Sequence, residues 1–179
     1  MVGDFMRKVE VVIYDALWPV QFDIEAGKIQ RIFGDEIIDI HHIGSTSVEG
    51  LYAKPVIDMM PVVEDVSRVD QFDSEMKAIG YGAKGEFGIT GRRFFQKGGE
   101  NRTHHVHIIE AGSTHLERHL AFRDYLRAHP DKAASYSRLK LDLAARFPDD
   151  IAAYIEGKHR FVQETEQKAL AWYREKSIP

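Results

Sequence analysis

The pattern of hydrophobic and polar residues changes at about residue 112, from short apolar runs to helical spacing. In the first part, short apolar runs lie between turn residues, which is typical of strands. These runs predict strands at residues 9–14, 37–43, 55–63, 87–89, 93–96 and 105–109. Apolar side chains that recur at helical intervals, each series followed by a glycine, predict helices at residues 15–33 and 66–79.

Beyond residue 113 no segment has the composition of a strand, and three helices are predicted. Thr114 with Glu117 forms a capping-box pattern for the first helix, and proline-aspartate pairs at 130–131 and 148–149 separate it from the next two. We therefore expect an α/β (α+β) protein with a mixed sheet flanked by helices. Residues 1–112 would form the α/β core, and residues 113–179 a three-helix region packed on it as a single compact unit.

Composition narrows the classes of function. The chain of 179 residues contains no cysteine, which excludes disulfides, thiolate catalysis and cysteine-based zinc sites. A net charge of -4 gives no general attraction for nucleic acid. No apolar run reaches the length of a membrane span, and the N-terminal residues lack the apolar core of a signal peptide. These features favour a cytoplasmic protein.

The first candidate for chemistry is Gly44-Ser45-Thr46, where an apolar run ends in a turn. Such a turn offers a phosphate close backbone approach, free amides and a hydroxyl. The alternative is an ordinary turn with a helix N-cap at Ser47. Lys54 is a candidate cation for the same phosphate, although an exposed lysine ahead of a strand is commoner. The spacing is not that of a P-loop.

A single carboxylate, Asp58, lies in the apolar run 55–63. A buried acid is costly unless a cation or hydrogen bonds stabilise it, so a metal ligand is the first interpretation. A structural acid that caps a helix or pairs with arginine is the second. In a strand, Asp58 and Met60 point to the same face.

His105 and His107 alternate in the predicted strand 105–109, so both lie on one face and can share a ligand or a metal ion. Structural histidines are the alternative. Arg93 leads into Phe94-Phe95 and suits bidentate contact with phosphate. Arg92 is more typical of a solvated surface residue.

Taken together, four segments resemble the GrpB family of small bacterial proteins over most of the chain, from about Tyr14 to the last helix. They are HHIGSTSVEGLYAKPVIDM, RRFF, THHVHIIEAGS and LAFRDYLRAHPDKAASYSRLKLDLAARF. That family is assigned to the nucleotidyltransferase (DNA polymerase β-like) superfamily. The resemblance implies a Gly-Ser turn at Gly44-Ser45 and, after twelve residues (46–57), the first metal-binding carboxylate at Asp58.

The chain departs from the superfamily pattern at two positions. Met60 stands where a second carboxylate is expected, and His105 or His107 stands where a third would fall. One carboxylate with two imidazoles is a poorer site for Mg²⁺ than three carboxylates and suits Mn²⁺ or Zn²⁺ better. The resemblance therefore implies the fold more strongly than the reaction.

The resulting hypothesis is a nucleotidyltransferase-fold protein that binds a nucleotide or another phosphorylated small molecule at Gly44, Ser45, Thr46, Lys54 and Arg93. Asp58 and His107 would be catalytic, and a divalent cation, Mg²⁺ or Mn²⁺ with Zn²⁺ as an alternative, would bind Asp58, His105 and His107. The other hypotheses are a catalytically degenerate nucleotide-binding or partner module and a metal-dependent phosphoesterase. No strong nucleic-acid signal and no membrane segment is present, and the sequence allows an oligomer.

Overall fold

The computed structural model describes residues 8–177. Its contacts divide these residues into two units. The first unit comprises residues 8–15, 44–55 and 117–177, and the second comprises residues 16–43 and 56–116. The chain therefore passes between the units more than once. The predicted boundary at residue 112 stays a prediction.

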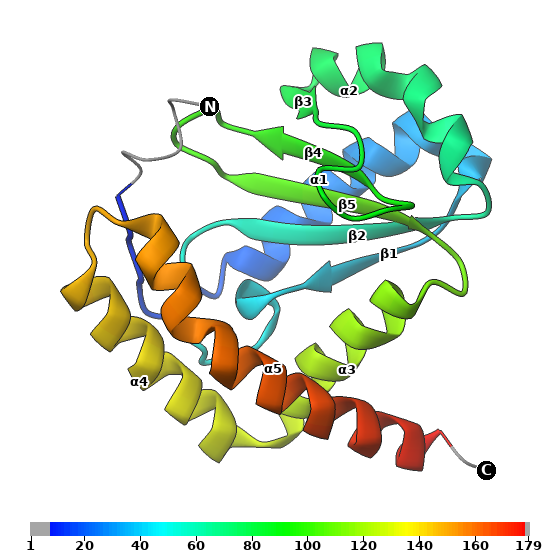
Figure 1. The fold of residues 1–179 in the computed structure, drawn as a ribbon. Helices are drawn as coiled ribbons and strands as arrows, with labels where there is room; N and C mark the ends of the chain where they lie inside the picture. The colour runs from blue at the N-terminus through cyan, green and yellow to red at the C-terminus, as the bar shows by residue number, and fades with distance from the viewer. Residues whose placement is uncertain (1–7, 178–179) are drawn as a thin grey trace. The chain divides into compact units, whose positions relative to one another are not determined.

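The second unit contains a five-stranded sheet with the strand order β1-β2-β5-β4-β3 (Figure 1). The strands are β1 (Ile37–Ile43), β2 (Ile57–Val63), β3 (Tyr81–Ala83), β4 (Arg93–Lys97) and β5 (His104–Glu110). β2 and β5 pair in parallel, whereas the other neighbours are antiparallel. The prediction of a mixed sheet flanked by helices is confirmed. β2 is almost wholly buried, as its near-continuous apolar residues indicate, whereas β5 buries Val106, Ile108 and Ile109.

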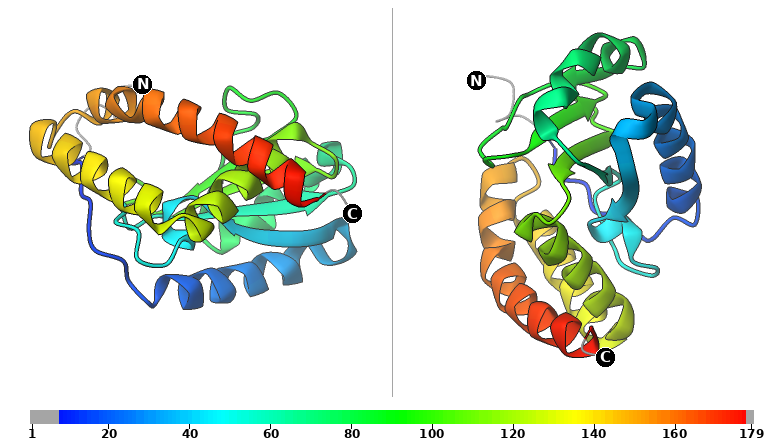
Figure 2. Two further views of the ribbon diagram at one scale, coloured as in Figure 1. Left: turned by 90° about the horizontal axis from the view of Figure 1, so that it is seen from below. Right: turned by 90° about the vertical axis from the view of Figure 1, so that its right-hand side faces the viewer.

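Helix α1 (Trp18–Phe33) packs against β1 and β2 (Figure 2). Pro19 lies in its first turn, where the missing amide hydrogen costs nothing. Gly34 follows the last turn with a φ of 54°, a conformation that glycine adopts without steric cost. The helix buries Ile29 and Phe33, while Met59, Val106 and Ile108 of the sheet are also fully enclosed.

Two predicted strands are wrong. Residues 9–14 form only one isolated bridge, between Val12 and Ala53, because this apolar run supplies Val9 to a helical core instead of joining the sheet. Residues 87–89 form turns around Phe87, which has a φ of 48°. The short strand β3 was not predicted. The predicted helix 66–79 is a 3-10 helix over Val66–Phe72 and an α-helix, α2, only over Asp73–Ala78.

The three predicted helices of the C-terminal region are present as α3 (Thr114–Ala128), α4 (Pro130–Arg146) and α5 (Ile151–Lys176). Within the first unit, α4 and α5 lie side by side (Figure 1). Its core consists of small clusters. One is formed by Val48, Leu51, Leu126 and Tyr136, another by Val9, Leu143 and Tyr154, and a third by Ala121, Tyr125 and Ala169. No helix within residues 8–177 combines the length and the hydropathy needed to cross a membrane.

The first turn of α3 differs in detail from the predicted capping box. The amide of His115 donates to the Oγ of Ser113 at 3.2 Å, so Ser113 satisfies an amide at the start of the helix. Glu117 instead accepts both bonds of a bidentate pair with Arg174, at 2.8 and 2.9 Å. The glutamate predicted to cap α3 therefore joins that helix to α5.

Gly157 allows α5 to approach α4 closely. A Cβ built on this residue would clash with Cδ2 of Leu143, which is 3% exposed. We expect Gly157→Ala to lower the free energy of unfolding by about 1 kcal/mol, because the overpacking cost exceeds the gain in helix propensity. Urea unfolding measures the change. In a Leu143→Ala background the same substitution should stabilise the protein, and destabilisation in both backgrounds would contradict this explanation.

Candidate functional site

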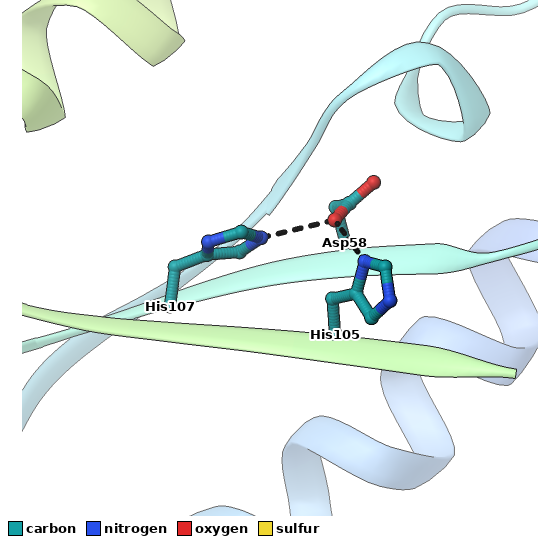
Figure 3. Close-up of side chains that lie close together, drawn as sticks. All are labelled: Asp58, His105 and His107. Carbon is teal, nitrogen blue, oxygen red and sulfur yellow. Dashed lines mark hydrogen bonds and ion pairs between the residues drawn. The ribbon is translucent and has the colours of Figure 1, made fainter. Parts of the chain in front are cut away.

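The pairing of β2 with β5 brings Asp58 and two histidines together. Asp58 is the register partner of His105, and His107 follows two residues later on the same face of β5. The Oδ1 atom of Asp58 lies 3.0 Å from Nε2 of His107 and 3.4 Å from Nδ1 of His105. Figure 3 shows both imidazoles directed at the carboxylate. We call Asp58, His105 and His107 the carboxylate–histidine cluster.

The cluster is enclosed on its sides but retains some exposure. The side chains of Asp58, His105 and His107 are 28%, 18% and 14% exposed. Phe94 of β4 packs its ring 5.4 Å from that of His105 and 5.0 Å from that of His107. Burial raises the pKa of Asp58, but the hydrogen bonds from His105 and His107 outweigh that effect and hold the pKa well below its usual range. Asp58 is therefore ionised at neutral pH.

The cluster fits a divalent cation in ligand type and spacing. One ligand atom from each of the three residues lies within 4.8 Å of the others. One carboxylate oxygen with two imidazole nitrogens suits Mn²⁺ or Zn²⁺ better than Mg²⁺, which prefers oxygen ligands. A histidine that binds a metal ion through one ring nitrogen usually donates the N–H of the other ring nitrogen to an acceptor. In the described residues, Nε2 of His105 is buried without a partner, and Nδ1 of His107 faces Arg92. The site therefore lacks part of the support that strengthens metal binding.

Sequence reasoning treated Arg92 as a surface residue, but the structure places it against the cluster. Arg92 is 8% exposed, and its Nη1 lies 3.2 Å from Nδ1 of His107. The same guanidinium donates to the carbonyl of Phe87 at 2.7 Å. Because arginine can only donate, Nδ1 of His107 must accept, and the proton of the neutral ring lies on Nε2, facing Asp58. That tautomer competes with metal binding through Nε2.

We expect Arg92→Met to raise the affinity for Zn²⁺ or Mn²⁺ about tenfold, because a competing tautomer and a nearby positive charge are both removed. Isothermal titration calorimetry measures the change. The variant should also melt at a lower temperature, since the carbonyl of Phe87 loses its donor. Arg68→Met, at an exposed arginine paired with Glu36, is the control. A lower metal affinity in Arg92→Met than in the wild type would contradict the explanation.

Arg93 lies where it cannot join the cluster, and Met60 contributes no carboxylate to it. Arg93 is the register partner of Ile108 and points to the opposite face from Phe94, where it forms a bidentate pair with Asp70. Met60 shares a face with Asp58, as predicted, but is 1% exposed. The second carboxylate position is therefore occupied by a packed apolar side chain.

The predicted phosphate-binding turn belongs to the first unit. Gly44 has a φ of 72°, and the 3-10 helix Ser45–Ser47 follows it. Thr46 is 2% exposed. The Nζ of Lys54 lies 5.6 Å from the centre of the Tyr154 ring. These positions show a formed glycine-led turn with Lys54 in the same unit.

Sequence reasoning also missed Lys140 of α4, which donates from Nζ to the Oγ of Ser45 at 2.9 Å. The sequence signal that could have identified Lys140 is its spacing from the apolar residues of the same helix. Tyr136, Lys140 and Leu143 lie on one stripe of the helix, and all three are buried.

Comparisons with known proteins agree with this fold. The GrpB protein family model matches residues 8–168. The UPF0157 protein YqkA of Bacillus subtilis (strain 168) is 54% identical over 166 residues, which are 93% of this chain and 48% of YqkA. The chain thus spans about half the length of that relative.

Two solved structures extend the comparison. The crystal structure of the conserved protein GrpB from Enterococcus faecalis is similar with a TM-score of 0.89 and 44% identity, covering 92% of this chain and 99% of that one. The Cid1 poly(U) polymerase with MgGTP bound has a TM-score of 0.52 and 16% identity, covering 76% of this chain and 45% of that one. The second likeness concerns the fold alone. The chain belongs to the GrpB family and has a nucleotidyltransferase-like fold.

Proposed function

We propose that this protein binds a nucleotide or another phosphorylated small molecule together with a divalent cation, and transfers a nucleotidyl group to an acceptor. The observation that carries the proposal is the convergence of Asp58, His105 and His107 on one face of the sheet, with ligand atoms within 4.8 Å of one another. The fold supports it, because the similar Cid1 structure holds MgGTP.

Each residue has a proposed role. Asp58, His105 and His107 hold the cation, which supplies positive charge against the phosphates when it is bound. Asp58 is ionised at neutral pH, so it meets the cation as a carboxylate. Gly44, Ser45 and Thr46 offer backbone and hydroxyl contacts to phosphate, and Lys54 offers charge. Arg92 takes the place that the sequence assigned to Arg93, since it lies beside His107.

The test is pyrophosphate release from each of the four nucleoside triphosphates, with Mg²⁺, Mn²⁺ or Zn²⁺ and a panel of hydroxyl and amine acceptors. We expect turnover in the wild type with Mn²⁺, and a loss of at least 100-fold in Asp58→Asn. A phosphatase screen run in parallel detects a phosphoesterase. No turnover together with no nucleotide-induced thermal shift would end the proposal.

The second candidate is a nucleotide-binding module without catalysis. Met60 favours it, because this buried side chain occupies the second carboxylate position and leaves Asp58 as the single carboxylate in the cluster. Two-metal catalysis needs more than one carboxylate. This candidate predicts that nucleotide binding survives Asp58→Asn and that the wild type shows no turnover. Equilibrium binding of a fluorescent nucleotide to both proteins separates the two candidates.

A further inference from the structure

The loop between β3 and β4, in the second unit, exposes a large aromatic side chain, Phe87. This side chain is 54% exposed. Its ring stacks on that of Phe94, with 5.1 Å between the ring centres and an angle of 13° between the ring planes. Phe94 therefore covers one face of the Phe87 ring, and the exposed surface of Phe87 includes the other face.

The backbone holds Phe87 in an unfavourable conformation. Its φ of 48° lies in the left-handed region, where glycine or asparagine is usual and a bulky side chain is strained. Among residues 8–177, Phe87 is the single residue other than glycine with a positive φ. Such strain persists only where the surrounding structure enforces it, and strained residues gather at ligand-binding sites.

Arg92 enforces this conformation. Its guanidinium donates to the carbonyl of Phe87 at 2.7 Å and to that of Glu86 at 3.2 Å. The amide of Gly91 closes the loop further, because it donates to the side chain of Glu86 at 2.9 Å. The loop thus constrains the Phe87 ring before any ligand binds, which lowers the entropic cost of stacking on it.

The Phe87 ring lies close to the carboxylate–histidine cluster. Besides stacking on Phe87, the ring of Phe94 lies 5.4 Å from that of His105 and 5.0 Å from that of His107. Arg92 forms a second connection, since its Nη1 lies 3.2 Å from Nδ1 of His107. An exposed aromatic surface therefore lies one ring away from the candidate cation site.

We propose that Phe87 is a binding residue that stacks on the base of the nucleotide whose phosphates meet the cation at the carboxylate–histidine cluster. This role rests on the proposed function. It narrows the substrate class from any phosphorylated small molecule to one that carries a planar aromatic base.

The chemistry of the two neighbouring surfaces favours a nucleotide. A cation at the cluster attracts phosphate, whereas the exposed face of a phenylalanine ring attracts a planar ring and offers no hydrogen bond. Aromatic side chains can stack on every base, because each base has a π-face. In a nucleotide the sugar separates the base from the phosphates, so one molecule can reach both surfaces. A sugar phosphate or an inorganic phosphate would leave the Phe87 ring exposed.

The test compares ligands with and without a base. Calorimetry measures the affinity of the full chain for tripolyphosphate and for the four nucleoside triphosphates, each as its Zn²⁺ complex. We expect at least one nucleotide to bind tenfold or more tightly than tripolyphosphate. Phe87→Leu should weaken the binding of that nucleotide at least fivefold and change the affinity for tripolyphosphate less than twofold, because leucine is apolar but has no ring.

Two variants are matched controls. Phe87→Tyr keeps an aromatic ring and should bind the nucleotide within twofold of the wild type. Ile38→Ala shortens a side chain of β1 in the same unit that is 53% exposed, and it should also bind within twofold. Together they separate the loss of the ring from the loss of exposed apolar surface.

Nuclear magnetic resonance reports the stacking directly. Zn²⁺ is diamagnetic, so the base protons of the bound nucleotide remain observable. The ring current of Phe87 should move these protons upfield when the nucleotide binds the wild type or Phe87→Tyr. At saturation the upfield shift should fall by half or more in Phe87→Leu.

Equal nucleotide affinity in the wild type and Phe87→Leu, or equal base-proton shifts, would overturn the role of Phe87. A nucleotide that bound no more tightly than tripolyphosphate would also overturn it and leave the proposed binding of cation and phosphate standing. If the wild type bound neither ligand, the proposed function and the role of Phe87 would both fall. The measurements need no turnover, so they apply equally to a nucleotide-binding module without catalysis.

Discussion

Replacing Asp58 with asparagine is expected to weaken the binding of Mn²⁺, Zn²⁺ or Co²⁺ by at least 100-fold. Asp58 is the carboxylate of the cluster, and both imidazoles are directed at it. Asparagine has nearly the same shape but carries no negative charge and is a poor metal ligand. The substitution therefore removes the charge on which the affinity depends and leaves the packing in place. Calorimetry and the visible absorption of bound Co²⁺ measure the loss.

The matched control is Asp39→Asn in the same unit. Asp39 is an exposed carboxylate of β1 that also lies near a histidine, with its Oδ2 3.4 Å from Nε2 of His41. If metal bound wherever a carboxylate meets a histidine, both variants would lose affinity. We expect Asp39→Asn to bind as the wild type does. A wild-type affinity in Asp58→Asn would show that the cluster is a structural hydrogen-bonded group.

The second large effect is expected in stability. Lys140→Met should raise the free energy of unfolding by about 2 kcal/mol or more at pH 7, and the melting temperature by roughly 4–8 °C. The folded protein holds Lys140 in a place where burial lowers its pKa to about 6, whereas in the unfolded chain this lysine keeps its ordinary pKa of 10.5 and stays protonated. Methionine fills a similar volume without a charge to desolvate.

The sign of the pH dependence follows from the same shift. Between about pH 6 and pH 10.5 the unfolded wild type binds one more proton than the folded protein, so its stability rises with pH over this window. Lys140→Met should lack that contribution, and its advantage should shrink as the pH rises. Urea unfolding at several pH values measures both curves, with Lys168→Met as the control. A variant less stable than the wild type throughout would mean that Lys140 is a structural anchor for Ser45.

Much of the carboxylate–histidine cluster could be predicted from the sequence. The two-residue period of a strand put His105 and His107 on one face, and an isolated acid in an apolar run singled out Asp58. Their contact depends on the parallel register of β2 with β5, which places Asp58 beside His105. That register depends on packing between distant segments, and no local pattern contains it.

Residues whose surroundings come from other segments were missed or misplaced. Lys140 occupies a buried stripe of α4, but a lysine on a helix usually extends to solvent, so its residue type outweighed its spacing. Arg92 and Arg93 are adjacent, and only the pairing of β4 with β5 decides which one meets His107. The run 9–14 has strand composition, yet tertiary packing uses it in a helical core.

The parallel pairing of β2 with β5 has a consequence for the order in which the protein folds. Asp58 and His105 lie on strands that are separated by the segment from Glu64 to Thr103. They meet only after the two ends of that segment have come together. Loop closure over such a distance is slow compared with helix formation. When a cobalt ion is present during refolding, its visible absorption should therefore report the pairing of β2 with β5. This absorption should appear later than the far-ultraviolet circular dichroism signal of the helices.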